Sequence, residues 1–402
     1  MNLRSKISLL SIFCVLFLTA SSHAADWPRW RGPDVNGISR ETGWQSKWPE
    51  TGPKQLWKAS IGIGFSGISV SQGRAYTMGN IDNGSDVVYC LDAATGAIIW
   101  RHSYPCDLDP KYFEGGPTAT PTVDGDRVYT CSRKGDLFCL DAAKGNVIWS
   151  NNISRDLGCQ SPTWGFSGSV LVEGNLVILD AGPAGTAFDK TTGKLAWSSG
   201  KEKPGYSTPV PFDIGTQHAI AILGANALQV VNAADGKSLW SFPWKSFSDI
   251  NVADPVISGN KVFISAGYSH GCTLIDNHAD PKVYWQNKNL RMRFNNAVLW
   301  DGFIYSADES GELKCVSWDT GEIKWSDKSF GQGSLLIADG KIIGLSEHGE
   351  LLVADATPAG FKPISRAQVL GGKCWTMPVL ANGHIYCRNA KGDLLCLDVT
   401  GP

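Results

Sequence analysis

Four side chains that could bind a metal ion lie close together in one stretch of the chain. His270, Cys272, Asp276 and His278 provide imidazole, thiolate and carboxylate groups. Their spacing is not that of a structural zinc site, which draws its ligands from closely spaced pairs. The stretch also reads as a β-hairpin, where alternation along the strand would send these side chains to different faces. We therefore interpret it as a polar turn with a free thiol and predict no metal site.

A glycine-rich stretch, Gly62-Ile-Gly-Phe-Ser-Gly67, has the G-x-G-x-x-G spacing of dinucleotide-binding loops. Such a loop must follow a strand and open a helix, because the phosphates bind at the helix N-terminus. Here the next residues, 68–76, read as strand, turn and strand. We interpret the stretch as the start of a β-strand rather than a cofactor loop.

Other catalytic patterns are missing from the sequence. It contains no H-E-x-x-H, no G-x-S-x-G and no phosphate-binding loop. The remaining histidines of the expected mature chain are isolated, and the carboxylates are spread among turns without a pair suited to acid–base chemistry. We therefore predict no catalytic residues.

The elements that must position any site repeat along the chain. One motif occurs five times along the chain. In each copy a glycine stands four residues before a tryptophan, and Asp or Asn and small residues precede the glycine. The five pairs are Gly96 and Trp100, Gly145 and Trp149, Gly193 and Trp197, Gly236 and Trp240, and Gly321 and Trp325. Each copy reads as strand, turn, strand. Because a lone hairpin cannot bury its apolar face, neighbouring copies must stack.

The repeat count predicts an all-β fold, an eight-bladed β-propeller with four-stranded antiparallel blades. Eight third strands end at a mean spacing of about 44 residues, which suits one propeller blade each. Their last residues are Asp92, Asp141, Asp189, Asn232, Asp276, Ser317, Asp355 and Asp398. The last unit has no room for a fourth strand, and 51–57 supplies a matching one. We expect this N-terminal strand to close the last blade; the alternative is an open array.

A ring of polar and aromatic residues is the candidate binding site. In a propeller, the residues at which the chain enters the inner strands line the mouth of the central channel. Aligning these positions gives Phe65, Trp164, Phe166, Tyr206, Asn251, Asp254, Arg293, Asn295, Gln332 and Trp375. The mixture suits a flat or polar ligand, held by stacking and a few hydrogen bonds. The alternative is that these groups only cap the channel and satisfy strand ends.

The motif Asp-x-x-Thr-Gly-x-x-x-Trp, repeated around a ring, resembles the tryptophan-docking motif of the pyrroloquinoline-quinone (PQQ) repeat propellers. That group includes the quinoprotein alcohol dehydrogenases and the BamB-type outer-membrane assembly proteins. The opening residues 26–33 resemble those of exported PQQ-like propellers of planctomycetes and their relatives. The resemblance implies that tryptophans dock between adjacent blades, namely Trp57, Trp100, Trp149, Trp197, Trp240, Trp285 and Trp325. The unit around Asp355 lacks a matching tryptophan, which implies a weaker contact there.

The sequence lacks residues that characterise the quinoprotein dehydrogenases and residues that characterise the BamB-type proteins. The quinoprotein dehydrogenases carry adjacent cysteines at the cofactor and a carboxylate base beside a calcium site, and neither matches a segment here. BamB-type proteins are lipid-anchored, whereas Cys14 is not preceded by a small residue and is a poor lipid-attachment site. The fold is therefore implied more strongly than the activity.

The N-terminus reads as a secretory signal over residues 1–24. Arg4 and Lys6 give a basic start, 7–20 an apolar core, and Ser22-His-Ala24 a small-residue cleavage site. A membrane anchor is the alternative, but the run is shorter than the roughly 20 residues that a spanning helix needs. We expect a periplasmic or secreted protein with no transmembrane segment. Residues 25–50 should form an ordered strap across the propeller rather than a flexible tail, and 51–402 the propeller itself.

Ten cysteines remain in the expected mature chain. Four of them, Cys90, Cys139, Cys315 and Cys396, occupy the same repeat position and are interpreted as buried apolar fillers. Cys106 and Cys159 lie in corresponding loops and form the best candidate for a disulfide, with two free thiols as the alternative.

These features favour a binding protein over an enzyme. A formal net charge of −2 argues against nucleic acid or an anionic membrane as the main partner. We predict a monomeric, non-catalytic scaffold in the cell envelope that binds an envelope protein or a small flat or polar ligand. One alternative is a PQQ-dependent alcohol or sugar dehydrogenase with PQQ and calcium in the channel, using Arg293, Asn295, Asp254 and Trp164 or Trp375. Another is a polysaccharide-binding protein.

Overall fold

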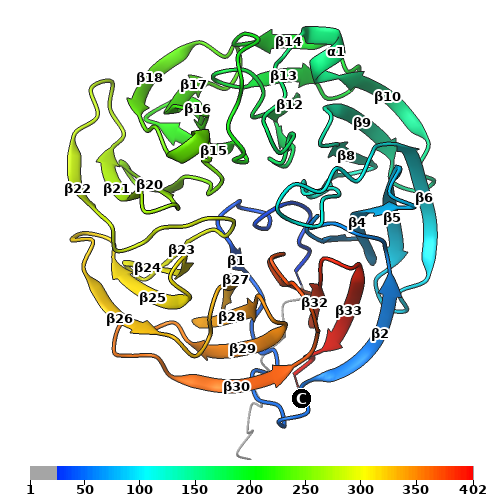
Figure 1. Cartoon of the computed structure of the whole chain (residues 1–402), viewed down its shortest axis with the longest axis vertical. Helices are drawn as coiled ribbons and strands as arrows, with labels where there is room; N and C mark the ends of the chain where they lie inside the picture. The colour runs from blue at the N-terminus through cyan, green and yellow to red at the C-terminus, as the bar shows by residue number, and fades with distance from the viewer. Residues whose placement is uncertain (1–24, 402) are drawn as a thin grey trace, which may run out of the picture.

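The computed structural model describes residues 25–401, so the expected signal segment 1–24 lies outside the described residues. The chain forms eight sheets arranged in a ring, each containing four antiparallel strands (Figure 1). This confirms the predicted eight-bladed β-propeller. We number the blades 1 to 8 in chain order, beginning with the sheet that contains β3.

The first four blades run from residue 69 to residue 243. Blade 1 comprises β3 (Ser69–Ser71), β4 (Arg74–Ile81), β5 (Ser85–Asp92) and β6 (Ile98–Pro105). Blade 2 comprises β7 (Thr122–Asp124), β8 (Arg127–Cys131), β9 (Asp136–Asp141) and β10 (Val147–Asn152). Blade 3 comprises β11 (Leu171–Glu173), β12 (Leu176–Leu179), β13 (Thr186–Asp189) and β14 (Leu195–Ser198). Blade 4 comprises β15 (Val210–Ile214), β16 (Gln217–Leu223), β17 (Ala227–Asn232) and β18 (Ser238–Pro243).

The other four blades complete the ring. Blade 5 comprises β19 (Val256–Ser258), β20 (Lys261–Ala266), β21 (Gly271–Asp276) and β22 (Val283–Asn287). Blade 6 comprises β23 (Val298–Trp300), β24 (Phe303–Asp308), β25 (Glu312–Ser317) and β26 (Ile323–Asp327). Blade 7 comprises β27 (Gly333–Ala338), β28 (Lys341–Ser346), β29 (Glu350–Asp355) and β30 (Pro363–Gln368). Blade 8 comprises β31 (Val379–Ala381), β32 (His384–Arg388), β33 (Asp393–Asp398) and β2 (Lys54–Ser60).

The ring is closed by the first long strand of the chain. β2 pairs antiparallel with β33, from Lys54 opposite Asp398 to Ser60 opposite Asp393. This confirms that the N-terminal strand completes the last blade. The pairing leaves no open blade at the join, so both ends of the array are covered. A two-residue strand that the sequence did not predict, β1 (Ile38–Ser39), adds in parallel to β27.

Helices contribute little to this fold. They are α1 (Ile153–Leu157), between blades 2 and 3, and the single turn η1 (Phe247–Asp249), between blades 4 and 5. Neither helix of the described chain has the length and apolar character needed to cross a membrane.

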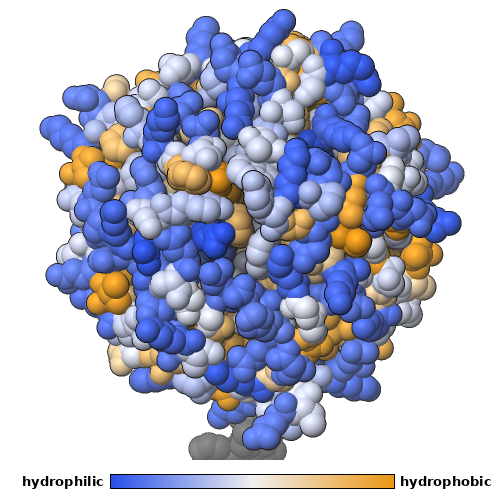
Figure 2. All heavy atoms as spheres, in the orientation of Figure 1, coloured by the Kyte–Doolittle hydropathy of each residue, from blue (hydrophilic) through white to orange (hydrophobic). Residues whose placement is uncertain are grey.

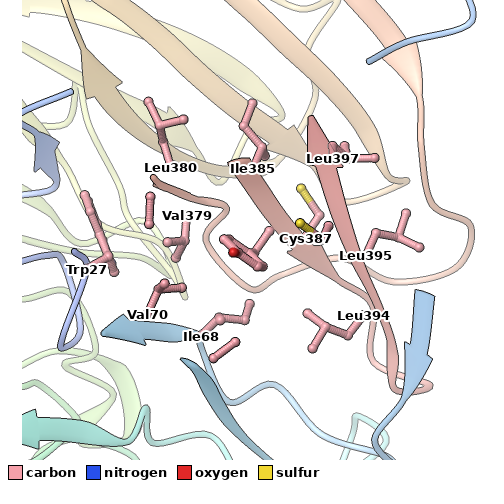
Figure 3. Close-up of a cluster of buried hydrophobic side chains, with 14 of the residues drawn as sticks. Trp27, Ile68, Val70, Val379, Leu380, Ile385, Cys387, Leu394, Leu395 and Leu397 are labelled. Atoms are coloured by element: carbon pink, nitrogen blue, oxygen red, sulfur yellow. The ribbon is translucent and has the colours of Figure 1, made fainter. Parts of the chain in front are cut away.

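Burial along each strand follows its place in the blade. The third strand of blade 1, β5, has six consecutive buried residues, because both faces pack against neighbouring blades. The outer strand β6 instead exposes Ile98 and Ile99 and buries Trp100. The core is thus a chain of clusters between adjacent sheets. One of them joins Trp27 to inner-strand residues of blades 1 and 8 (Figure 3).

Seven tryptophans on outer strands reach from one blade to the next. The indole N–H of each donates a hydrogen bond of 2.7 to 3.2 Å to an acceptor that follows the third strand of the next blade. These interblade tryptophans are Trp57, Trp100, Trp149, Trp197, Trp240, Trp285 and Trp325. Trp57 donates to Ala93 and thereby links blade 8 to blade 1.

The glycine of the repeat motif receives the tryptophan of the preceding blade. A Cβ added at Gly96 would lie 2.6 Å from the Trp57 ring, and one at Gly145 would lie 2.5 Å from the Trp100 ring. The same contact recurs between Gly193 and Trp149, Gly236 and Trp197, and Gly321 and Trp285. Glycine is therefore needed for space as well as for its left-handed backbone.

Between blades 7 and 8 the N-terminal segment covers the place without a tryptophan. Ser365 occupies the matching position on β30, opposite Val353. Its Oγ accepts a hydrogen bond from the Trp48 N–H, at 3.2 Å. The Gln45 N–H donates to the Val399 carbonyl on blade 8, and the Trp44 side chain is buried in the same cluster.

The cysteines are buried and free throughout residues 25–401. Cys90, Cys139, Cys315 and Cys396 lie in the cores between blades, as predicted. The predicted disulfide between Cys106 and Cys159 was wrong. Cys106 packs between blades 1 and 2, whereas Cys159 packs between blades 2 and 3. Corresponding loops of adjacent blades lie one blade apart, so equivalence in the repeat keeps the two thiols separate.

Two glycines of blade 1 allow a test of the interblade contact. Gly96 and Gly73 have nearly identical φ, 72° and 73°, but a Cβ at Gly73 would meet nothing within 4 Å. We expect Gly73→Ala to cost only the backbone strain, about 1–2 kcal/mol. Gly96→Ala should cost about 1–3 kcal/mol more, because its methyl group overlaps the Trp57 ring. Urea unfolding of both variants measures the difference, and equal losses would contradict the packing role.

Candidate functional site

The N-terminal segment 26–39 crosses one end of the central channel (Figure 1). It bonds to the inner strands of blades around the ring. The contacts are Trp27 with Val70, Pro28 with Val123, Arg29 with Val172, Arg31 with Ala297, β1 with β27, and Asp26 with Asn382. We call this segment the strap. Most of these contacts lie within or after the inner strands, although Ala297 immediately precedes β23, and the residues that precede the inner strands line an open pocket.

The open pocket has a volume of about 570 Å³. Trp30 of the strap lines it, together with side chains that precede the inner strands. Six of the ten predicted site residues line this pocket, namely Phe65, Trp164, Tyr206, Asp254, Arg293 and Trp375. The volume falls within the range of small-molecule sites, roughly 300–1,000 Å³.

The other four predicted residues lie elsewhere. Asn295 and Gln332 line a cavity of about 20 Å³ that shares Arg293 and Trp375 with the pocket. Phe166 is buried between blades 2 and 3. The Asn251 amide is fully buried and donates to three backbone carbonyls, those of Gly224, Ala225 and Trp244. Phe166 and Asn251 therefore hold loops in place rather than face a ligand.

Several aromatic residues that the repeat alignment did not select also line the pocket. They are Trp30, Tyr112, Phe113, Phe247 and Tyr268. Phe294, which lies between Arg293 and Asn295 in the alignment, lines the pocket as well. Tyr112 and Phe113 lie on the long connection from β6 to β7, and Phe247 lies on the connection from β18 to β19. The signal that could have found Tyr112, Phe113 and Phe247 is the presence of aromatic residues on unusually long connections, whereas Tyr268 lies in a short turn between β20 and β21.

One wall of the pocket is a continuous row of rings. Trp375 stacks between Phe65 and Phe294, with centroids 5.3 and 4.7 Å away and interplanar angles of 28° on both sides. Phe113 meets the edge of Phe65 at 5.6 Å. Arg293 continues the row, since its guanidinium carbon lies 5.0 Å from the centroid of Phe294. Across the pocket, Trp164 and Tyr206 lie 6.0 Å apart.

Asp254 is the carboxylate that lines the pocket, and its two oxygens already interact with other groups of the protein. Its Oδ2 accepts a 2.7 Å hydrogen bond from Trp30 Nε1, and its Oδ1 accepts one of 2.7 Å from the Thr208 N–H. Arg31 Nη1 lies 3.8 Å from Oδ2, and both side chains are buried. Burial raises the pKa of Asp254, and the Arg31 charge opposes that shift. Asp254 therefore anchors the strap and leaves little capacity for acid–base chemistry.

The glycine-rich stretch 62–67 positions Phe65, and its backbone N–H groups donate hydrogen bonds to other parts of the protein. The N–H groups of Gly64 and Phe65 donate to the carbonyls of Ala390 and Pro117. The buried Arg388 guanidinium donates to the Gly64 carbonyl at 2.8 Å. No helix follows the stretch. A dinucleotide phosphate would find these N–H groups already bonded.

The stretch around Cys272 does not gather its four candidate ligands. Cys272 is fully buried on β21, whereas the His270 ring packs edge-on against Trp244 at 4.4 Å. His278 lies 3.5 Å from Asp276 at the exposed turn. Across residues 25–401, no three side chains of His, Cys, Asp or Glu come together as a metal site.

This donor set does not fit the calcium ion of the PQQ alternative. Calcium needs six to eight oxygen ligands, several of them from carboxylates. Asp254 is the carboxylate that lines the pocket, and Trp30, Thr208 and Arg31 already engage it. The pocket is better suited to stacking and to single hydrogen bonds than to metal binding.

Figure 2 shows hydrophobic atoms on this view of the molecule as separate patches among hydrophilic ones. A permanent protein interface would favour one large continuous apolar patch. Aromatic side chains instead gather in the lining of the pocket.

Comparisons with known proteins agree on the fold. The sequence model of a family described as outer membrane protein assembly factor BamB matches residues 35–107 and 84–327. No curated protein sequence matches the chain. BamB from Moraxella catarrhalis is 15% identical, with a TM-score of 0.64 over 86% of this chain and 99% of that one.

Two dehydrogenases also match in structure. Quinohemoprotein alcohol dehydrogenase from Comamonas testosteroni is 13% identical, with a TM-score of 0.66 over 95% of this chain and 82% of that one. A europium-containing methanol dehydrogenase is 12% identical, with a TM-score of 0.69 over 90% and 89%. At such identities the likeness establishes the fold alone.

We predict that Asp254→Asn loosens the strap and destabilises the protein. The substitution leaves the buried Arg31 charge without its counter-ion, which typically costs about 3–5 kcal/mol. Asp34→Asn is the matched control, because Asp34 lies on the same segment but forms an exposed ion pair with Arg40. That control should change stability by about 0–1 kcal/mol. Urea unfolding and proteolysis within 26–39 measure both variants, and equal behaviour would contradict the anchoring role.

Proposed function

The chain belongs to the family described as outer membrane protein assembly factor BamB, and from that premise we propose that it is a non-catalytic binding protein exported to the cell envelope. Its ligand enters the channel mouth and rests on the aromatic wall of the pocket. The fold is shared by binding proteins and by dehydrogenases, so the side chains of the site decide between these functions.

The observation that carries the proposal is the composition of the pocket. Aromatic side chains from six of the eight blades converge on it, in the order Phe65, Trp164, Tyr206, Tyr268, Phe294 and Trp375. Serine and threonine hydroxyls and the amide of Asn296 supply polar contacts between the rings. A flat or ring-shaped ligand can stack on such walls and form a few oriented hydrogen bonds.

The chemical groups needed for catalysis are not free in this pocket. Asp254 is bound by three protein groups, and Lys111 pairs with Asp109 at 3.3 Å. Arg293 can stabilise an anion through its N–H donors and has no acceptor atom. Binding without turnover is therefore the activity that these residues support.

Export is supported by the sequence of residues 1–24, and the buried free cysteines are compatible with it. All ten described cysteines are buried, and burial raises the pKa of thiols such as Cys106 to about 12. The thiolate is the reactive form of cysteine, so these groups resist oxidation outside the cytoplasm. The chain can thus remain reduced in an oxidising compartment without disulfides.

An envelope protein is the second candidate partner, and two exposed aromatic residues favour it. Tyr112 is 98% exposed and Phe247 is 64% exposed, and both line the pocket. Exposed aromatic residues beside a pocket often anchor a partner protein. A loop inserted into the pocket would contact both.

We expect the mature chain to bind members of a panel of neutral and acidic oligosaccharides and free PQQ, without turnover. Trp375→Ala and Trp164→Ala should each weaken binding about 10-fold, because each removes a stacking surface. Tyr284→Ala is the control, since Tyr284 is 50% exposed on the outer strand of blade 5, away from the pocket. Isothermal titration measures affinity, and urea unfolding confirms that each variant is folded.

Two results would contradict this proposal. One is dye-linked oxidation of alcohols or sugars after reconstitution with PQQ and calcium. The other is that no ligand of the panel binds in a way that depends on Trp164 or Trp375.

A further inference from the structure

Arg293 is the cation of the pocket that lacks a protein partner. Its guanidinium carbon lies 5.0 Å from the ring centroids of both Phe294 and Tyr268. Among the described residues it forms no ion pair, and its buried Nε has no hydrogen-bond acceptor. The buried Arg133, by contrast, donates to the Leu108 carbonyl and to Asp109.

The other charges around the pocket are compensated. Lys111 lies 3.3 Å from Asp109, and Lys373 lies 2.9 Å from Glu114. The negative charge of Asp254 is paired with the positive charge of the buried Arg31. Arg293 therefore leaves the pocket with one positive charge that a ligand can neutralise.

The surroundings of Arg293 hold the guanidinium in place for this task. Contact with two aromatic rings restrains the guanidinium through cation–π attraction, and its N–H groups remain available as hydrogen-bond donors. Gly267 provides the space, because a Cβ there would lie 2.5 Å from Arg293 Cγ. A planar guanidinium held in this way suits a carboxylate or sulfate group, which can accept two parallel hydrogen bonds.

The rest of the pocket indicates what carries the anionic group. Sugar rings present C–H faces that stack on aromatic rings and hydroxyls that bond to polar side chains. Ser167, Thr208 and Ser248 place hydroxyls among the rings, and Asn296 adds an amide. We propose that the pocket binds acidic sugars, whose carboxylate or sulfate group is bound by Arg293. This inference rests on the proposed binding function and names its ligand class.

Matched pairs of ligands test the inference. The probes are oligomers of galacturonic, glucuronic and mannuronic acid with their methyl esters, and sulfated galactose oligomers with their desulfated forms. The wild-type protein should prefer the charged member of at least one pair by about 10-fold or more, as expected for a charge-assisted hydrogen bond. A preference confined to uronates or to sulfated oligomers identifies the anionic group.

Variants at position 293 locate the charge recognition. Arg293→Gln should remove the preference for the charged ligand, so that the charged and neutral members of a pair bind with similar affinity. Arg293→Lys should retain part of it, because lysine keeps the charge but loses the planar pair of donors. Equal affinity for matched pairs, an unchanged preference in Arg293→Gln, or no binding of any sugar would overturn the inference. Binding that needs Trp375 but ignores charge would overturn this inference alone and leave the proposed function standing.

A separate observation concerns Glu41, a buried carboxylate without a Lys or Arg partner in the described chain. Glu41 is 1% exposed, and its Oε2 accepts a 2.9 Å hydrogen bond from the Gly383 N–H of blade 8. Its Oε1 lies 3.3 Å from the backbone nitrogen of Ala25. Buried carboxylates are usually paired with a cation. The ionisable groups near it are His384 and Tyr386 on β32.

Cleavage after Ala24 would turn this contact into an ion pair. Hydrolysis of the bond between Ala24 and Ala25 consumes one water, leaves a carboxylate on Ala24 and creates an α-amino group on Ala25, which is protonated near neutral pH. We infer that this ammonium group pairs with Glu41 and fastens the strap to blade 8 only in the processed chain. The inference rests on the predicted cleavage and is independent of the pocket ligand.

A double-mutant cycle measures this pairing. Its four proteins begin either at Ala25 or with one added glycine, which moves the ammonium by about 3.8 Å, and carry either Glu41 or Glu41→Gln. Urea unfolding should show that Glu41→Gln destabilises the Ala25 form more than the extended form, with a coupling of about 10-fold in the unfolding equilibrium. A coupling near unity would overturn the inference. So would N-terminal sequencing of the exported protein that finds a first residue other than Ala25.

Discussion

The structure depends on the fit of an indole ring against a glycine in the next blade. Five of the seven interblade tryptophans lie over a glycine of the following repeat, and all seven donate a hydrogen bond to that blade. A side chain at the glycine would push the two sheets apart, and a smaller residue in place of tryptophan would leave a cavity. The same contact therefore sets the spacing and the angle between sheets. Eight sheets related in this way close into a ring.

The strap changes what a closed ring can do. An open channel would let ligands pass, whereas Trp30, held by Asp254, lines the bottom of a pocket. Burying Asp254 and Arg31 together costs desolvation, and the hydrogen bonds from Thr208 and to Ala297 offset part of it. The residues that follow the strap, 44–48, cover the interface of blades 7 and 8, where the repeat lacks its tryptophan. One irregular segment thus completes both the core and the site.

The blade count and the closing strand could be predicted from the sequence, because glycine and tryptophan recur at a fixed spacing. Phe65, Arg293 and Trp375 could be found for the same reason, since they stand where the chain enters inner strands. Phe113, Phe247 and Tyr268 could not, because their loops differ from blade to blade and follow no period. The disulfide prediction failed for a related reason. Cys106 and Cys159 occupy equivalent loops of adjacent blades, so they pack into different interblade cores. Phe166 and Asn251 show that a residue next to the channel can point into the core instead.

The repeat and the irregular loops carry different information. The inward faces of the blades need only small and apolar residues that fit the neighbouring sheet, so they constrain shape and leave function open. The pocket combines loops from most blades with the strap, and each contributes one or two side chains. A change in a single loop can therefore alter the ligand without disturbing the ring. Arg293 illustrates this, because it contacts two rings from blades 5 and 6 and forms no ion pair with another described residue.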